Sequence, residues 1–121
     1  MSQLVLLERK TRLWHIERAA STIVGYTTGK SAIDYENDEM LRDAIERQMI
    51  IIGEAMRKAL EIDRTLINQI TDVDQIIAFR NQLVHNYPNL DQVKVWKVIQ
   101  TDLPLLVTEV RAVLATPDDD E

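Results

Sequence analysis

The sequence predicts an all-α fold, an antiparallel bundle of four to five helices. Only three glycines and three prolines interrupt its 121 residues, apolar residues recur at helical spacing, and no stretch alternates between apolar and polar residues for long. This length suits one domain with one core. We therefore expect a single helical domain over residues 1–116, followed by an acidic, flexible tail at 117–121.

The first helix is expected from Leu4 to Val24. Gly25 and Gly29 are expected to end it, and the polar stretch from Tyr26 to Asn37 is interpreted as a loop between two antiparallel helices. The residues available for the buried stripe of this helix are Leu6, Leu13, Ile16, Ala20 and Ile23.

The second helix is expected from about Asp38 to Leu60. Asn37 or Asp38 can accept hydrogen bonds from its first N–H groups, and acidic residues in its first turn suit the positive end of the helix dipole. Its apolar face contains Leu41, Ala44, Ile45, Gln48, Ile52, Ala55, Met56 and Ala59.

A short helical turn between Asp63 and Ile70 is expected to lead into the next helix, which Thr71 or Asp72 could cap. Pro88 should end that helix, because proline disfavours the α conformation in the residue before it.

The last helix follows, with Asp91 as its cap. Pro104 lies inside it and predicts a kink. Its apolar positions include Val95, Trp96, Ile99, Leu103, Leu106, Val107, Val110 and Leu114.

Composition narrows the classes of function. The formal net charge is −6 and the pI is near 4.9, so an RNA contact would need a local basic patch. There is no cysteine, which leaves no disulfide or zinc–thiolate site and fits a reducing cytoplasm. The apolar run from Leu4 to Leu7 is too short for a signal peptide or a membrane span. We expect a cytoplasmic protein without a membrane-spanning segment.

Arg80 lies in the middle of an apolar helix face. On a helical wheel of about 100° per residue, five apolar residues fall within roughly 60° of it. An unpaired guanidinium in a core is costly, so Arg80 is expected to pair with a carboxylate, line a wet cleft or face another subunit. The five apolar residues are Val73, Ile76, Ile77, Leu83 and Val84.

Asn81 and His85 are four residues apart and share one stripe on the flank of that face. Arg80 and His85 are roughly 140° apart on a straight helix. Within one chain they could cooperate only if the helix unwinds near Pro88. The alternative is a cleft shared by two copies of the helix, which favours a homodimer with a two-fold axis.

An arginine and a histidine can together cleave RNA without a metal ion or another cofactor. The 2′-hydroxyl is an internal nucleophile, an imidazole can transfer protons near neutral pH, and a guanidinium donates two parallel hydrogen bonds to phosphate oxygens. Asn81 could orient the imidazole or donate to the phosphate. The hydroxyl of Tyr87, just past the helix end, would be accessible to RNA or to modification.

Each of these residues also has a structural interpretation. A histidine near a helix end is more often a capping or surface residue than a catalyst, and a tyrosine before a proline usually packs against its neighbours. Arg80 could form an ion pair with Glu54 or another carboxylate. Spacing alone favours the structural interpretation.

The stretch from Arg80 to Tyr87 resembles the motif of the HEPN-domain toxins, in particular of the HepT-like group. That motif reads arginine, a polar residue, four to six residues, histidine, any residue and tyrosine, and Arg80, Asn81, His85 and Tyr87 match every specified position. The likeness covers nearly the whole chain. It extends to Asp43, Ala44 and Arg47, to Ile51 through Ala55, and to Leu90 through Leu106. The chain departs from many relatives at 71–74, where Thr-Asp-Val-Asp replaces a proline–tryptophan pair.

The resemblance implies a small helical dimer that acts as a metal-independent endoribonuclease, the toxin of a toxin–antitoxin pair. The implied partner is a minimal nucleotidyltransferase (MNT) antitoxin, which silences the toxin by AMPylation of Tyr87. The added phosphates would compete with RNA for Arg80 and His85.

Among site residues, the resemblance marks Arg80 and His85 as catalytic and Asn81 as supporting. Glu54 also matches the family signature, and we rank it second because it could instead pair with Arg47 or Arg57. Two other classes of function remain open. One is a non-catalytic module that binds nucleotides or docks a partner beside a nucleotidyltransferase, and the other is a structural helical oligomer.

Overall fold

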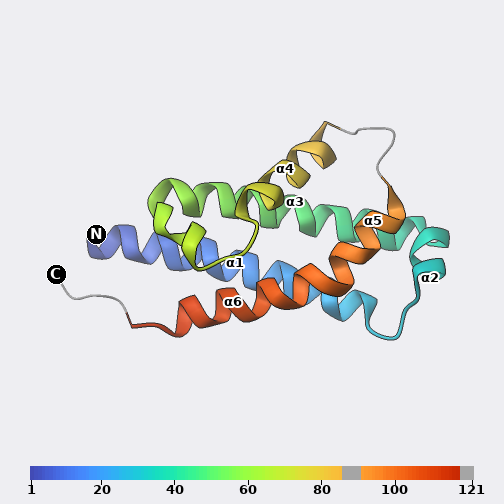
Figure 1. Cartoon of the computed structure of the whole chain (residues 1–121), viewed down its shortest axis with the longest axis horizontal. Helices are drawn as coiled ribbons and strands as arrows, with labels where there is room; N and C mark the ends of the chain where they lie inside the picture. The colour runs from blue at the N-terminus through green and yellow to red at the C-terminus, as the bar shows by residue number, and fades with distance from the viewer. Residues whose placement is uncertain (86–90, 118–121) are drawn as a thin grey trace.

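The computed structural model describes residues 1–85 and 91–117, and it is a helical bundle in which no described residue lies in a β-strand (Figure 1). Since α5, η2 and α6 form one continuous helical stretch, the described α-helices make five units, in agreement with the predicted all-α bundle. The elements are α1 (Gln3–Thr27), α2 (Ala32–Asn37), α3 (Glu39–Ile62), the 3₁₀ turn η1 (Arg64–Asn68), α4 (Val73–Val84), α5 (Gln92–Lys97), the π-helical turn η2 (Val98–Asp102) and α6 (Leu103–Ala115).

Three long helices surround the core. Figure 1 shows α1 and α3 running side by side in opposite directions, with α6 returning antiparallel to α1. α4 packs against α3, and η1 leads from the end of α3 toward it. The largest fully buried side chains come from many of these elements and include Leu13, Ile16, Ile23, Tyr35, Ile45, Met56, Leu66 and Val110.

Aspartates cap two of the helices as predicted. Asp38 accepts a hydrogen bond from the N–H of Leu41 at 3.0 Å, which begins α3. Asp91 accepts from the N–H groups of Val93 at 3.0 Å and Lys94 at 3.4 Å, which begins α5. A carboxylate at this position satisfies N–H groups that have no partner inside the helix.

The first helix continues past Gly25, so the prediction that this glycine ends it was wrong. Thr27 is buried, and its hydroxyl donates to the carbonyl of Ile23 at 2.9 Å, so packing holds the last turn in place. The chain turns instead at Gly29, whose φ of +77° suits a residue without a side chain.

Ala32–Asn37 forms α2, so the predicted loop was also wrong there. The N–H of Asp34 donates to the Ser31 hydroxyl at 3.2 Å, and the N–H of Ser31 donates to the Asp34 carboxylate at 2.8 Å, which is a capping box. Tyr35 is buried, and its ring centroid lies 5.7 Å from that of Trp96. A local cap and a distant aromatic contact together stabilise this short helix.

Pro104 was predicted to kink the last helix, and in the structure the π turn η2 directly precedes it. Proline has no N–H, and its ring crowds the carbonyl four residues earlier, so a wider turn accommodates it.

The start of α4 differs from the prediction. Asp72 occupies the cap position with a φ of +58°, but its side chain makes no capping hydrogen bond. The N–H and hydroxyl of Thr71 donate instead to Glu109 at 3.0 and 2.9 Å. α4 ends at Val84, and Pro88 lies outside the described residues.

α6 ends at Ala115, and the acidic residues 118–121 of the predicted tail lie outside the described part of the chain. In that described part, no helix combines the length and the apolar character needed to cross a membrane.

Candidate active site

The helix that carries the motif crosses α3 at Gly53. A Cβ atom added to Gly53 would lie 2.1 Å from the Cβ and 2.7 Å from the Cγ of Arg80, far closer than two carbon atoms can approach. Only glycine therefore permits this separation between α3 and α4. Sequence reasoning placed Gly53 in a family signature but assigned it no role, because the neighbour that requires it is 27 positions away.

Arg80 pairs with a carboxylate, the first of the three alternatives that its position allowed. Its Nη2 lies 3.1 Å from Oε2 of Glu54, and its Nη1 donates to Oδ1 of Asn81 at 2.9 Å. Nε is buried and has no hydrogen-bond partner. The side chain is 26% exposed, so the guanidinium is held by α3 but remains within reach of a ligand.

Glu54 is the centre of a small charged cluster on α3. Its carboxylate lies 2.8 Å from Arg57 and 3.7 Å from Lys58 in addition to its contact with Arg80. The hydrogen bond from Arg57, and then the charges of Arg57, Arg80 and Lys58, outweigh desolvation and lower the pKa of Glu54. Arg57 also contacts Glu61 at 2.6 Å, so cations outnumber carboxylates by one in this cluster. Glu54 thus pairs with Arg57, one of the two alternatives offered, rather than with Arg47.

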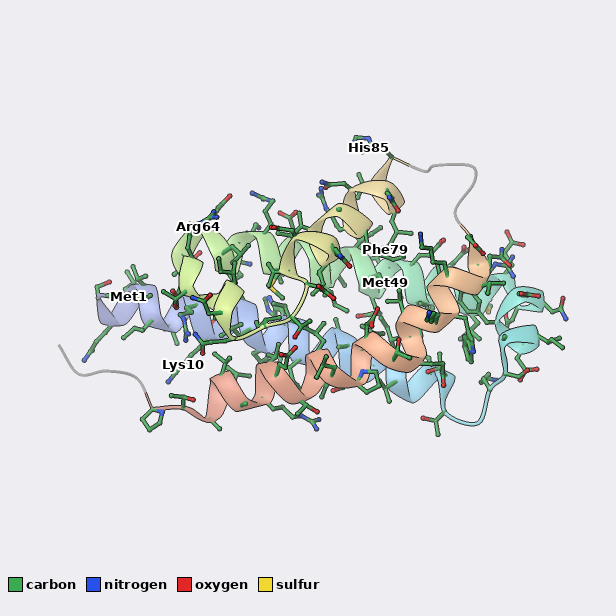
Figure 2. The ribbon with its side chains drawn as sticks, in the orientation of Figure 1. Met1, Lys10, Met49, Arg64, Phe79 and His85 are labelled. Carbon is green, nitrogen blue, oxygen red and sulfur yellow. The ribbon has the colours of Figure 1, made fainter. Side chains whose placement is uncertain are left out.

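Asn81 and His85 follow Arg80 along α4. The amide oxygen of Asn81 accepts from Arg80, so in this structure Asn81 orients the guanidinium. Its backbone carbonyl accepts the N–H of His85 at 3.1 Å, and His85 is the C-terminal cap residue of α4. His85 is exposed at the outer end of α4, away from the rest of the bundle (Figure 2).

Arg80 and His85 are thus on different sides of α4. Arg80 turns toward α3, whereas His85 lies where the helix ends. Tyr87, the candidate for modification, lies outside the described residues.

The described side chains include a group that can bind phosphate, the guanidinium of Arg80, and a group that can transfer protons, the imidazole of His85. A guanidinium can donate to phosphate oxygens in pairs, and an exposed imidazole can accept or donate a proton. Within residues 1–85 and 91–117, no group of three or more His, Cys, Asp or Glu side chains is placed to hold a metal ion.

Comparison with known proteins adds a family match. The family model described as "Ribonuclease HepT-like" matches residues 16–113, a range that contains the whole of α3 and α4 and therefore the charged cluster and the motif helix. No solved structure matches the chain.

Individual relatives agree with this match. A protein of Methanocaldococcus jannaschii named "Putative RNase" is 29% identical over 106 residues, which cover 86% of this chain and 94% of that protein. A protein of Caldanaerobacter subterraneus subsp. tengcongensis, also named as a putative RNase, is 26% identical over 102 residues, which cover 84% of this chain and 90% of that protein. A third relative, again from M. jannaschii, is named "Gamma-glutamylcyclotransferase and putative RNase". It is 29% identical over 109 residues, which cover 90% of this chain and 49% of that protein.

Proposed function

Because this chain belongs to the HepT-like ribonuclease family, we propose that it is a metal-independent endoribonuclease toxin that uses Arg80 and His85. The observation that carries this proposal is the arrangement on α4. A partly exposed guanidinium is held by Glu54 and Asn81, and an exposed imidazole ends the same helix. In a chain of net charge −6, the cation-rich cluster beside Arg80 offers RNA the local basic patch that it needs.

The proposed reaction uses the RNA 2′-hydroxyl as the nucleophile. An imidazole of His85 takes the proton of this hydroxyl as its oxygen bonds to phosphorus, and the bond from phosphorus to the 5′-oxygen breaks. A protonated imidazole or a water molecule gives the leaving 5′-oxygen its proton. Arg80 exchanges Glu54 for the phosphate oxygens and stabilises their growing negative charge.

Glu54 acts here as a positioning residue. Its lowered pKa keeps it ionised, so it holds the guanidinium of Arg80 on α3 until a phosphate competes for it. Arg57 and Lys58 already lie around the carboxylate of Glu54, and in this proposal their positive charges attract a further phosphate of the RNA.

The test is RNA cleavage by purified variants in the presence of EDTA. His85→Ala and Arg80→Ala should each lower the cleavage rate at least about 100-fold, the usual loss when a general acid–base or a charge-stabilising group is removed. His15 is the other histidine of the chain, so His15→Ala is the matched control and should cleave normally.

Unchanged cleavage by His85→Ala would reject the proposed mechanism. If the wild-type protein binds nucleotides or a partner but never cuts RNA, the non-catalytic binding module would be the better description. The ion pair between Arg80 and Glu54 is the observation that favours that alternative, because it gives the arginine a structural partner.

The proposed antitoxin is a minimal nucleotidyltransferase that transfers AMP to Tyr87. Co-expression with such an enzyme should add one or more AMP masses to the peptide that contains Tyr87 and should abolish cleavage. Tyr26 is 42% exposed and is the internal control, because its peptide should stay unmodified. Inhibition without any added mass would indicate that the antitoxin acts by simple binding and not by AMPylation.

A further inference from the structure

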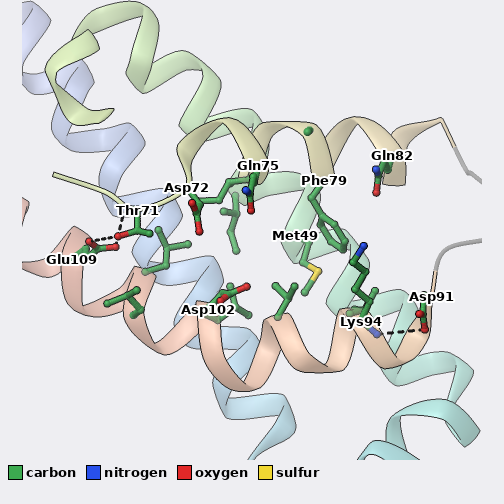
Figure 3. A pocket seen from close by; sticks show the side chains of 18 residues that line it. Met49, Thr71, Asp72, Gln75, Phe79, Gln82, Asp91, Lys94, Asp102 and Glu109 are labelled. Carbon is green, nitrogen blue, oxygen red and sulfur yellow. Dashed lines mark hydrogen bonds between the residues drawn. The ribbon is translucent and has the colours of Figure 1, made fainter. Parts of the chain in front are cut away.

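A long groove separates α4 from the last helices, on the face of α4 that does not carry Arg80. Its volume is about 630 Å³. Figure 3 shows Met49 and Phe79 at its centre, with η2 and α6 forming the opposite wall. The floor is apolar and includes Met49, Ile52, Ile76, Phe79, Val98 and Leu106.

The rim of this groove is acidic. Four carboxylates line it, Asp72, Asp91, Asp102 and Glu109, against one cation, Lys94. Asp91 caps α5 and Glu109 holds Thr71, so these two are already engaged.

Asp72 and Asp102 remain available from opposite walls. Asp72 makes no capping hydrogen bond, and among the described residues Asp102 accepts only from the neighbouring Thr101 at 3.2 Å. Figure 3 shows both carboxylates directed into the groove. Neither one pairs with a cation among the described residues.

The dimensions suit a helix of about three turns. The lining residues along α4 run from its cap residue Asp72 to Gln82, which at about 1.5 Å per residue gives a wall of about 15 Å. An amphipathic helix of that length presents one apolar ridge to the floor and its flanking residues to the two rims.

We propose that this acidic-rimmed groove docks a basic amphipathic helix of a protein partner. The apolar face of that helix covers Phe79 and Met49, and lysine or arginine residues on the flanks of the helix pair with Asp72 and Asp102. The groove is separate from the Arg80 cluster but shares α4 with it, so an occupant would contact the helix that carries the motif.

The charge of the rim disfavours two other occupants. RNA phosphates would meet four carboxylates and one lysine. A second copy of this chain carries a net charge of −6, so it would bring further negative charge to an acidic rim.

The experiment uses two synthetic helical peptides of about fourteen residues with the same leucine ridge. One has lysines on both flanks and the other has glutamates. Binding to the full chain is measured by fluorescence anisotropy, and the site is mapped by amide chemical shifts. The lysine peptide should bind at least about tenfold more tightly than the glutamate peptide and should change the amide chemical shifts of the groove residues. Its affinity should fall as the salt concentration rises.

The double variant Asp72→Asn with Asp102→Asn should weaken that binding about fivefold at low salt. Asparagine tolerates the left-handed backbone of position 72. The control is Asp43→Asn with Asp74→Asn, two exposed aspartates outside the groove, which changes the net charge equally and should leave binding unchanged. Neither pair should alter RNA cleavage, so the outcome is independent of the proposed ribonuclease activity.

Leu105 is 45% exposed at the edge of the groove and provides the second variant. Leu105→Lys should weaken binding of the lysine peptide more than tenfold while leaving the thermal unfolding temperature of the protein near that of the wild type.

Equal binding of both peptides, or an equal effect of the two double variants, would overturn the proposal. If Leu105→Lys instead dissociates a homodimer in sedimentation experiments, the groove belongs to a second copy. If an RNA oligonucleotide shifts the groove residues, the groove is part of the substrate site. Either result would also reject a partner helix.

Discussion

Gly53 is the residue on which the position of Arg80 depends. The carbon stem of Arg80 occupies the space where a side chain at position 53 would lie. Close packing of α4 on α3 at this point brings the guanidinium to Glu54. A residue with no side chain therefore determines where a charged side chain is held.

Replacing Gly53 by alanine should lower the free energy of unfolding by about 1–3 kcal/mol, because the added methyl group forces α3 and α4 apart. RNA cleavage should fall at least about tenfold, since Arg80 moves with α4. Urea unfolding and cleavage assays measure the two effects.

Gly25 provides the matched control, because a Cβ added there meets nothing within 4 Å. Gly25→Ala should instead raise the free energy of unfolding by about 0.5–1 kcal/mol, by restricting the unfolded chain. If both substitutions had the same effect, the contact at Gly53 would have no special importance.

At the scale of single residues, the sequence predicted that Arg80 needs a partner and offered Glu54 as one. It did so because a charge in an apolar stripe is costly wherever the helix packs. It also predicted that Asn81 could serve His85 or a phosphate, whereas in the structure Asn81 accepts from Arg80. Which of several neighbours a side chain contacts depends on rotamers that periodicity does not encode.

Among the secondary-structure elements, η1 packs Leu66 into the core, and Asp63 at its start connects it to α1. Asp63 follows the end of α3, and its carboxylate accepts from Nε of Arg9 on α1 at 2.8 Å and from the N–H and hydroxyl of Thr65. Its side chain is 9% exposed. Burial raises the pKa of Asp63, but these hydrogen bonds and the charge of Arg9 outweigh it and lower the pKa overall.

Asp63→Asn should lower the free energy of unfolding at neutral pH by about 1–3 kcal/mol, because a charged hydrogen-bond acceptor is lost. A lowered pKa in the folded state means that Asp63 stabilises the fold above its unfolded pKa of about 3.9 and ceases to do so as the pH falls through the folded value. The difference between wild type and variant should therefore disappear on acidification, which thermal melts between pH 7 and pH 2.5 would measure. A constant difference would contradict the assignment.

The elements predicted least well were those whose ends depend on tertiary contacts. Gly25 suggested a break in α1, yet buried Thr27 extends that helix. The segment that forms α2 is polar, but burial of Tyr35 against Trp96 makes it helical, and the same burial raises the pKa of Tyr35 to about 12. Local caps such as Asp38 and Asp91 were predictable because they act within three residues.

For the whole molecule, the separation of Arg80 and His85 on α4 has a consequence for assembly. Two copies related by a two-fold axis could bring the arginine of one to the histidine of the other. The homodimer stays a prediction, and it has a direct test in mixed oligomers.

Arg80→Ala and His85→Ala should each be inactive alone, but an equimolar mixture should recover about a quarter of wild-type cleavage. If the site is shared between copies, half of the dimers are mixed, and each mixed dimer has one intact site of two. Native mass spectrometry of the mixture, in which the mixed dimer has a mass between those of the two parent dimers, confirms that exchange has occurred. If no activity returns although mixed dimers form, both residues act within one chain.

The sequence by itself determined the helical class, the main helices and the residues with chemical potential, because helical periodicity, capping and the motif from Arg80 to Tyr87 are local patterns. The tertiary structure decided that Gly53 brings Arg80 to Glu54, that α2 is a helix, and that an acidic groove opens beside α4. These features depend on residues far apart in the chain, whose distances are set by how whole helices pack. A single sequence carries the preferences of each helix but not the separation between them.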